Sequence, residues 1–164
     1  MRRVGKLVLV AALVLASGAR AAPPEVGVLV PGRSLAGVSP GMTPAAVLRV
    51  WGRRHGVCRG CAHTTWYFNR KPFAPEGAGV ELRGGRVAAA FTLWKPSGWR
   101  TREGLVLGET VARITEVYGP LTRTECGTYY ALSLPRDGAV TVFYVSDEQL
   151  WGFGLMRSDV ARCR

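Results

Sequence analysis

A twelve-residue motif that occurs twice constrains the fold of this chain most strongly. Residues 41–52 read GMTPAAVLRVWG, and residues 108–119 read GETVARITEVYG. Five of the twelve positions are identical, and the pairs Val47/Ile114 and Trp51/Tyr118 keep their chemical character. Internal repetition of this kind indicates a chain built from copies of one structural unit.

Each copy of the motif is typical of a short, capped helix. Thr43 and Thr110 are N-cap candidates, because a threonine side chain can accept from the first free backbone N–H groups. Gly52 and Gly119 stand where a helix commonly ends in a left-handed residue. A helix of eight or nine residues is not stable alone in water. We therefore expect each helix to pack on the segment that follows it.

The segments after each motif are typical of β-strands, since they are rich in β-branched and aromatic residues and are separated by turn residues. The expected strands cover residues 64–69, 80–83 and 86–94 in the first half and 129–134, 140–145 and 149–156 in the second. The sequence thus predicts an α+β fold made by tandem duplication, in which each half is a short helix packed on a three-stranded antiparallel meander. The first repeat covers residues 40–96 and the second 97–164.

Alternation along these strands predicts two different sheet faces. The face expected to receive the helices is apolar and carries Val80, Leu82, Val87, Ala89, Phe91, Leu93, Tyr130, Leu132, Leu134, Val140, Val142, Tyr144, Trp151, Phe153 and Leu155. The opposite face mixes small residues with a few aromatics and carries Glu81, Arg83, Ala88, Ala90, Thr92, Trp94, Tyr129, Ser133, Thr141, Phe143, Gly152 and Gly154. Such a surface suits a sheet that another backbone can approach.

The N-terminus predicts export. Residues 1–21 combine a basic start, an apolar run over 7–16 and a small-residue cleavage site at 19–21, as a secretory signal does. The apolar run is too short to span a bilayer, which takes about 20 residues. The mature chain is therefore expected to be secreted or extracytoplasmic, without a transmembrane segment. Residues 22–39 are rich in Pro, Gly and Ala and predict a linker with at most one short strand, at 26–30.

The predicted mature chain is basic. Without the four basic residues of the signal, 18 arginines and lysines face 11 acidic residues, a net charge of +7. This balance favours anionic partners in general. No basic run reaches five residues and no nucleic-acid motif occurs, so no specific nucleic-acid partner is predicted.

Four cysteines in an exported chain indicate two disulfides. We favour Cys58–Cys61 and Cys126–Cys163, the second of which would pin the C-terminal tail to the second sheet. Two alternatives remain open. Cys58 and Cys61 form a C-x-x-C pair of the redox type, and His55 and His63 would complete four potential zinc ligands within nine residues. The oxidising compartment favours the disulfide, so no metal is predicted.

Catalytic motifs are absent from the sequence. The G-x-S-x-G, H-E-x-x-H and P-loop patterns do not occur, and Gly152-Phe153-Gly154 lacks the third glycine of a dinucleotide site. Both histidines lie beside the first cysteine pair. The sequence therefore predicts neither an enzyme nor a cofactor.

The duplicated motif, G-M-T-x-x-x-V in its first copy, with a glycine closing the helix, resembles the secreted β-lactamase-inhibitory proteins of actinomycetes. It is also similar to the single-repeat small lipoprotein of the outer-membrane barrel-assembly machinery. The first resemblance implies tandem units of helix and antiparallel sheet, a disulfide in each half and a partner protein bound on the sheet. Cys58 and Cys61 are closer together than the cysteine pairs of the inhibitors, and the lipoprotein's acylated cysteine is missing, so inhibition of a β-lactamase is not carried over.

The resulting prediction is a secreted, non-enzymatic protein-binding module, with an inhibitor-like role as one form of it, that binds an unknown protein through the open sheet face. Aromatic residues and arginine are common anchors in such faces. The predicted anchors are Arg83, Trp94, Tyr129 and Phe143. The alternative is a structural protein of the cell envelope that docks on an anionic polymer through its basic surface.

Overall fold

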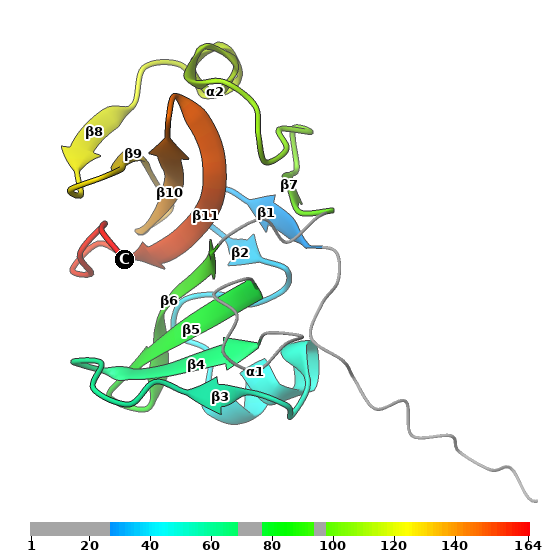
Figure 1. Ribbon diagram of the computed structural model, residues 1–164. Helices are drawn as coiled ribbons and strands as arrows, with labels where there is room; N and C mark the ends of the chain where they lie inside the picture. Colours follow the sequence, from blue (N-terminus) through cyan, green and yellow to red (C-terminus); the bar gives the residue numbers. More distant parts are fainter. Residues whose placement is uncertain (1–26, 69–76, 94–97) are drawn as a thin grey trace, which may run out of the picture.

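The computed structural model describes residues 27–68, 77–93 and 98–164 (Figure 1). The predicted export signal and the anchor Trp94 lie outside these residues. The helices are α1 (Pro44–Trp51) and α2 (Val111–Tyr118). The strands are β1 (Val28–Val30), β2 (Ser34–Leu35), β3 (Gly56–Val57), β4 (Thr64–Phe68), β5 (Gly77–Arg83), β6 (Arg86–Leu93), β7 (Arg100–Thr101), β8 (Thr122–Glu125), β9 (Tyr130–Arg136), β10 (Ala139–Ser146) and β11 (Gln149–Arg157).

Eight of these strands form one continuous antiparallel sheet, in the order β3-β4-β5-β6-β11-β10-β9-β8. At its centre β6 pairs with β11, with Ala90 opposite Leu155 and Phe91 opposite Gly154. The predicted α+β arrangement, with a separate three-stranded meander under each helix, is therefore wrong, because the chain is mostly β and its halves share one sheet. The β6–β11 pairing satisfies backbone groups that two separate meanders would leave unpaired at their edges.

A second, three-stranded sheet comes from segments in which few strands were expected. Its order is β2-β1-β7, with β1 antiparallel to β2 and parallel to β7. Leu29, Leu35 and Val38 are fully buried, so residues 28–38 belong to the folded body rather than to the predicted linker. Gly32 and Gly37 supply the positive φ angles, 75° and 80°, that allow such short strands to turn.

Both motif copies form the predicted capped helices. The Thr43 side chain accepts from the backbone N–H of Ala46 at 3.3 Å. The Thr110 side chain accepts from that of Arg113 at 3.4 Å. Each helix has eight residues and ends at a glycine with positive φ, Gly52 or Gly119. In the described part of the chain no helix is long and apolar enough to cross a membrane.

The helices and the small sheet enclose the first hydrophobic core against one face of the large sheet. Trp51 of α1 lies within it, where its indole N–H donates to the carbonyl of Ala36 at 2.9 Å. Its ring meets Phe68 edge-on, with centroids 5.2 Å apart. In the second half, Tyr118 of α2 stacks on Phe143 at 4.9 Å. Phe143 is fully buried, so its predicted role as an exposed anchor is wrong.

The opposite face of the large sheet, which we call the helix-free face, carries a second core. The predicted faces are wrong along β6, because the β5–β6 register shifts between Glu81 and Leu82. Val87 thus packs in the first core, whereas Ala89 and Phe91 pack in the second. A bulge of one residue moves every later side chain to the other face.

The helix-free face is not bare around β10 and β11. The ring of Tyr144 lies against Gly152 and Gly154, so that a Cβ on Gly154 would stand 2.9 Å from the Tyr144 hydroxyl oxygen. Val160, which follows β11, is also buried in the second core. The two glycines, predicted as open surface for a partner, therefore make room for a side chain of the same molecule.

Candidate functional site

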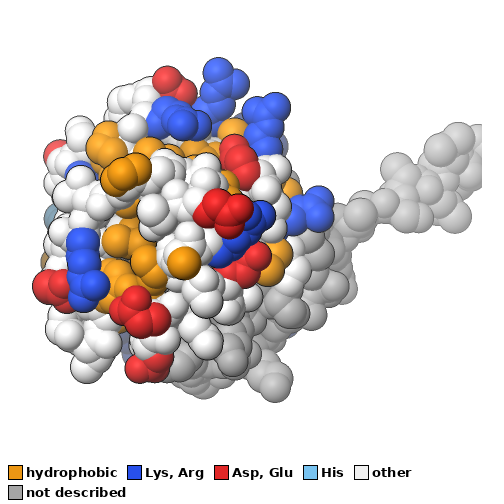
Figure 2. Space-filling model, turned by 90° about the horizontal axis from the view of Figure 1, so that it is seen from above, with side chains coloured by type: hydrophobic (Ala, Val, Ile, Leu, Met, Phe, Trp, Pro, Cys, Tyr) orange, Lys and Arg blue, Asp and Glu red, His pale blue; other side chains and the backbone are white. Residues whose placement is uncertain are grey.

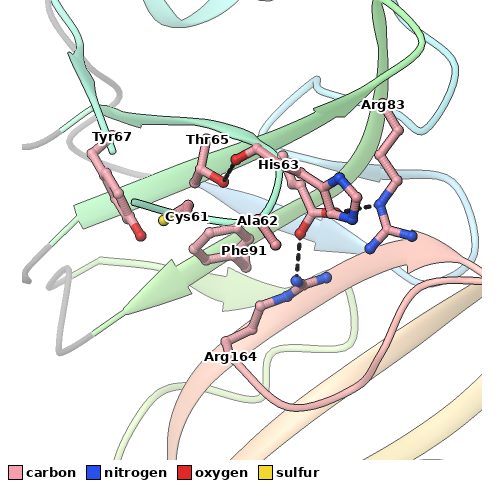
Figure 3. Close-up of a pocket in the computed structure, with 9 residues that line it drawn as sticks. Cys61, Ala62, His63, Thr65, Tyr67, Arg83, Phe91 and Arg164 are labelled. Atoms are coloured by element: carbon pink, nitrogen blue, oxygen red, sulfur yellow. Dashed lines mark hydrogen bonds and ion pairs between the residues drawn. The ribbon is translucent and has the colours of Figure 1, made fainter. Parts of the chain in front are cut away.

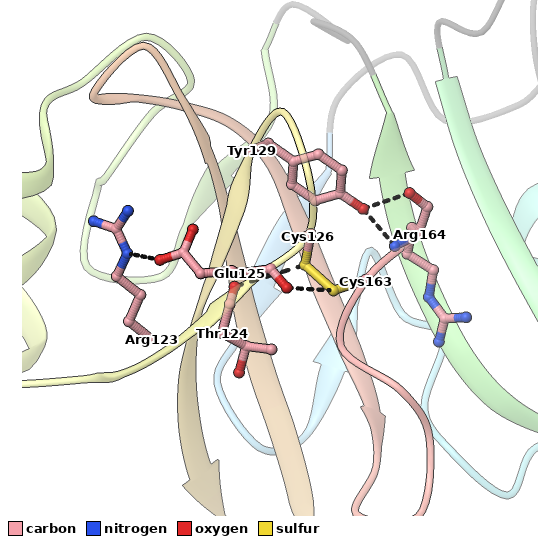
Figure 4. The surroundings of a disulfide bond; sticks show 7 residues. All are labelled: Arg123, Thr124, Glu125, Cys126, Tyr129, Cys163 and Arg164. Atoms are coloured by element: carbon pink, nitrogen blue, oxygen red, sulfur yellow. Dashed lines mark hydrogen bonds and ion pairs between the residues drawn. A yellow bond between two sulfur atoms is a disulfide. The ribbon is translucent and has the colours of Figure 1, made fainter.

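The C-terminal tail, residues 158–164, crosses the helix-free face and is anchored there by a disulfide (Figure 4). Cys163 bonds to Cys126, which follows β8, with Cα atoms 5.3 Å apart. The second disulfide joins Cys58 to Cys61 between β3 and β4. The prediction of disulfide bonds is thus confirmed, and the pairs are those favoured from the sequence.

Tyr129 holds the residue after that disulfide. Its hydroxyl accepts from the backbone N–H of Arg164 at 2.6 Å and donates to the carbonyl of the same residue. Its ring meets Tyr144 and Trp151 edge-on, with centroids 6.1 Å and 5.4 Å apart. Tyr129 is half-buried, and its contacts direct the side chain of Arg164 towards the first half of the sheet.

Arg164 lines a pocket that opens beside β4, β5 and β6 (Figure 3). Its volume is about 360 Å³. The remaining lining residues come from the loop before β4 and from the helix-free face of these strands: Cys61, Ala62, His63, Thr65, Tyr67, Glu81, Arg83 and Phe91. The pocket therefore combines the first half of the chain with its last described residue.

Buried ionic contacts form one wall of the pocket. Glu81 is only 5% exposed. One carboxylate oxygen accepts from Nε of Arg83 at 2.5 Å, and the other from Nη1 of Arg164 at 2.6 Å. Charged pairs of this kind are retained in a protein interior only when their hydrogen bonds are well formed. Two guanidinium groups against one carboxylate leave the wall with a net positive charge.

Aromatic rings form another wall. Phe91 lies across from Gly79 on β5, and a Cβ on Gly79 would stand 2.5 Å from the Phe91 ring. The glycine thus lets the ring lie flat over the strand, as in aromatic rescue of a glycine position. Tyr67 of β4 meets Phe91 edge-on at 6.3 Å. The guanidinium of Arg164 stands 5.4 Å from the Phe91 ring centre, within cation–π distance.

The hydrogen-bonding groups of the pocket that remain available to a ligand lie near its opening. Among the described residues, Arg83 makes its ion pair through Nε alone, so its two terminal nitrogens can donate to a ligand. His63 stands at the rim and is exposed. Both oxygens of Glu81 are engaged, and Cys61 is in a disulfide. The arrangement can therefore hold an anionic group through Arg83 and His63 and pack an apolar group against Tyr67.

The cysteine and histidine cluster has a different geometry from a zinc or redox site. The sulfurs of Cys58 and Cys61 are bonded to each other, and the next regular element is strand β4. The imidazole of His55 stacks on Trp66, with centroids 4.3 Å apart. Within residues 27–68, 77–93 and 98–164, no group of three or more His, Cys, Asp or Glu side chains is placed to hold a metal ion.

Of the predicted anchors, the structure brings two into one network. Arg83 lies in the pocket, and Tyr129 holds Arg164, which shares Glu81 with Arg83. Phe143 is in the first core, and Trp94 is outside the described residues. Sequence reasoning missed Arg164, although the predicted bond at the neighbouring Cys163 was a signal that the tail is held against the sheet.

Comparisons with known proteins show a likeness of fold. No protein family and no curated protein matches the chain. An extracellular protein containing an SCP domain from Bacillus anthracis str. Ames is 12% identical, with a TM-score of 0.49, over 72% of this chain and 44% of that one. This chain thus matches less than half the length of that protein. A DUF4309 family protein from Bacillus subtilis subsp. subtilis str. 168 is 11% identical, with a TM-score of 0.50, over 71% of this chain and 78% of that one.

Proposed function

We propose that this chain is an exported, non-enzymatic binding module that receives an acidic segment of a partner protein in the pocket beside Arg83. The observation that carries the proposal is the pocket wall, where two arginines share one buried carboxylate and leave a net positive charge beside two aromatic rings. A carboxylate of the partner would take the terminal nitrogens of Arg83, which form a fork suited to bidentate pairing. An apolar side chain of the partner would pack on Tyr67.

Two further observations support the proposal. The signal-like residues 1–21 and two disulfides favour an oxidising compartment outside the cytoplasm. Two groups in the pocket that could act as base or nucleophile, Glu81 and Cys61, are held in ion pairs and in a disulfide, while His63 stays exposed at the rim. The resemblance to the β-lactamase-inhibitory proteins, which bind a partner on the sheet, supports the same choice of face.

Photo-crosslinking from the pocket tests this function. A photoreactive residue in place of Ala62, which is exposed and lines the pocket, should capture the partner from the extracytoplasmic proteins of the source organism. The same residue in place of Ala45, exposed on α1, is the matched control and should not capture it. Equal capture from both positions, or none from position 62, would contradict the proposal.

Arg83→Ser should weaken binding of the partner so identified by about tenfold or more, as expected for an interface anchor. The reason is that the variant removes the terminal guanidinium nitrogens while Arg164 still pairs with Glu81. Arg86→Ser is the control, since this exposed arginine lies three residues away and contacts the carbonyl of Gly41. Titration by calorimetry compares the two variants. An equal loss of affinity in both would assign the effect to overall charge.

A further inference from the structure

The charge of this chain is unevenly distributed along its length. Residues 27–102 contain twelve arginines and lysines against two acidic residues, whereas residues 103–164 contain six against eight. In residues 103–164, three exposed arginines pair with acidic neighbours: Arg113 with Glu116, Arg123 with Glu125 and Arg157 with Asp159. Figure 2, which looks onto the α2 end, shows blue and red side chains next to each other.

Four exposed arginines lie within eleven residues of the first half, a stretch that we call the basic rim: Arg49, Arg53, Arg54 and Arg59. The stretch begins in the last turn of α1 and ends in the turn between β3 and β4, at the lower end of Figure 1. All four side chains are exposed. None of them has an ion-pair partner among the residues that the structure describes.

Two apolar side chains are interleaved with these charges. Val50 is 42% exposed and Val57 is 57% exposed. Among the described residues only one other large hydrophobic, Val106, is exposed to this degree. The stretch that carries them is fixed to the body, because Trp51 is buried, His55 stacks on Trp66 and Cys58 bonds to Cys61.

From this surface we infer a second activity, independent of the pocket: the basic rim docks the chain on an anionic lipid bilayer. Clustered arginines are attracted to the negative potential of anionic headgroups. Exposed aliphatic side chains between them add burial at the boundary between headgroups and acyl chains, which a dissolved polyanion does not offer. Because the rim arginines are held beside Val50 and Val57, this surface fits a lipid bilayer better than a soluble anionic polymer.

Vesicle co-sedimentation tests the inference with the exported protein. Wild type should bind vesicles of phosphatidylglycerol and phosphatidylcholine, should not bind pure phosphatidylcholine, and should be released by high salt. Arg49→Gln/Arg53→Gln/Arg54→Gln/Arg59→Gln should lower the partition coefficient at least about tenfold. The matched control, Arg33→Gln/Arg86→Gln/Arg100→Gln/Arg102→Gln, removes the same charge from four exposed arginines outside the rim and should keep most of the binding. All variants keep the same predicted export signal, residues 1–21, so a difference in vesicle binding between them is due to the substituted arginines.

A valine variant separates lipid from polymer. Val50→Ser/Val57→Ser keeps every charge and should weaken binding to anionic vesicles severalfold while leaving retention on a heparin column unchanged. This variant also keeps the inference testable if the quadruple rim variant fails to fold. Absence of wild-type binding to anionic vesicles, equal loss in the rim and control quadruple variants, or valine-independent binding to vesicles would each overturn it.

Discussion

Phe143→Ala is expected to lower the free energy of unfolding by about 3–5 kcal/mol, as truncations of buried phenylalanines do. The ring lies between Tyr118 of α2 and Phe153 of β11, with centroids 4.9 Å and 6.3 Å away. No part of it is exposed. Its removal would leave a cavity under α2, a helix of eight residues that depends on packing for its stability. Urea denaturation followed by circular dichroism measures the effect.

Phe143→Leu is the control for this prediction. It keeps most of the apolar volume and is expected to cost well under half as much as the alanine variant, since volume-conserving changes are tolerated best. If Phe143→Ala unfolds at the same urea concentration as wild type, the ring is not part of the core. In that case the face of β10 would have to be assigned as the sequence alone predicts.

Removing the Cys126–Cys163 bond by a double change to serine is expected to cost about 4 kcal/mol, whereas the same change at Cys58 and Cys61 is expected to cost about 2 kcal/mol. Both values follow from the loop-length dependence of chain entropy in the unfolded state. The bonded residues are 37 positions apart in the first pair and 3 in the second. The longer loop also carries Val160, which is buried in the second core.

The two double variants serve as controls for each other, because each replaces two cysteines by serines and leaves the other bond intact. Denaturant midpoints with unchanged slopes give the comparison. Equal losses would show that loop length does not govern these bonds. A larger loss for the Cys58–Cys61 variant would indicate that the turn before β4 is the more important support of the sheet.

The local elements of this fold were predictable, because their signals lie in neighbouring residues. Thr43 and Thr110 cap the helices, and Gly52 and Gly119 end them, as the motif predicts. The hairpin between the expected strands at 80–83 and 86–94 was equally predictable, since the two glycines that separate them, Gly84 and Gly85, can both adopt the positive φ of a tight turn. These signals say nothing about which strands of different halves meet, so the β6–β11 pairing and the single sheet were missed.

The faces of the sheet were less predictable, because both of them are covered. Alternation of apolar and polar residues identifies the core face of a strand only when the other face is solvated. In β10 every residue from Ala139 to Val145 is buried, so Phe143 and its neighbours Val142 and Tyr144 give no sign of direction. The pocket had a similar limit. Arg83 was selected as an arginine on an outer face. Its partner Glu81 also pairs with Arg164, which lies 83 positions further along the chain.

The ion pair between Glu81 and Arg164 also determines at what stage of synthesis and folding the pocket can form. Chains are made from the N-terminus, so β4, β5 and β6 are available before residues 158–164. During that interval Glu81 keeps Arg83 as its neighbour, and the wall contributed by Arg164 is missing. The pocket is therefore complete only after residues 158–164 have reached the sheet, where the Cys126–Cys163 bond holds them.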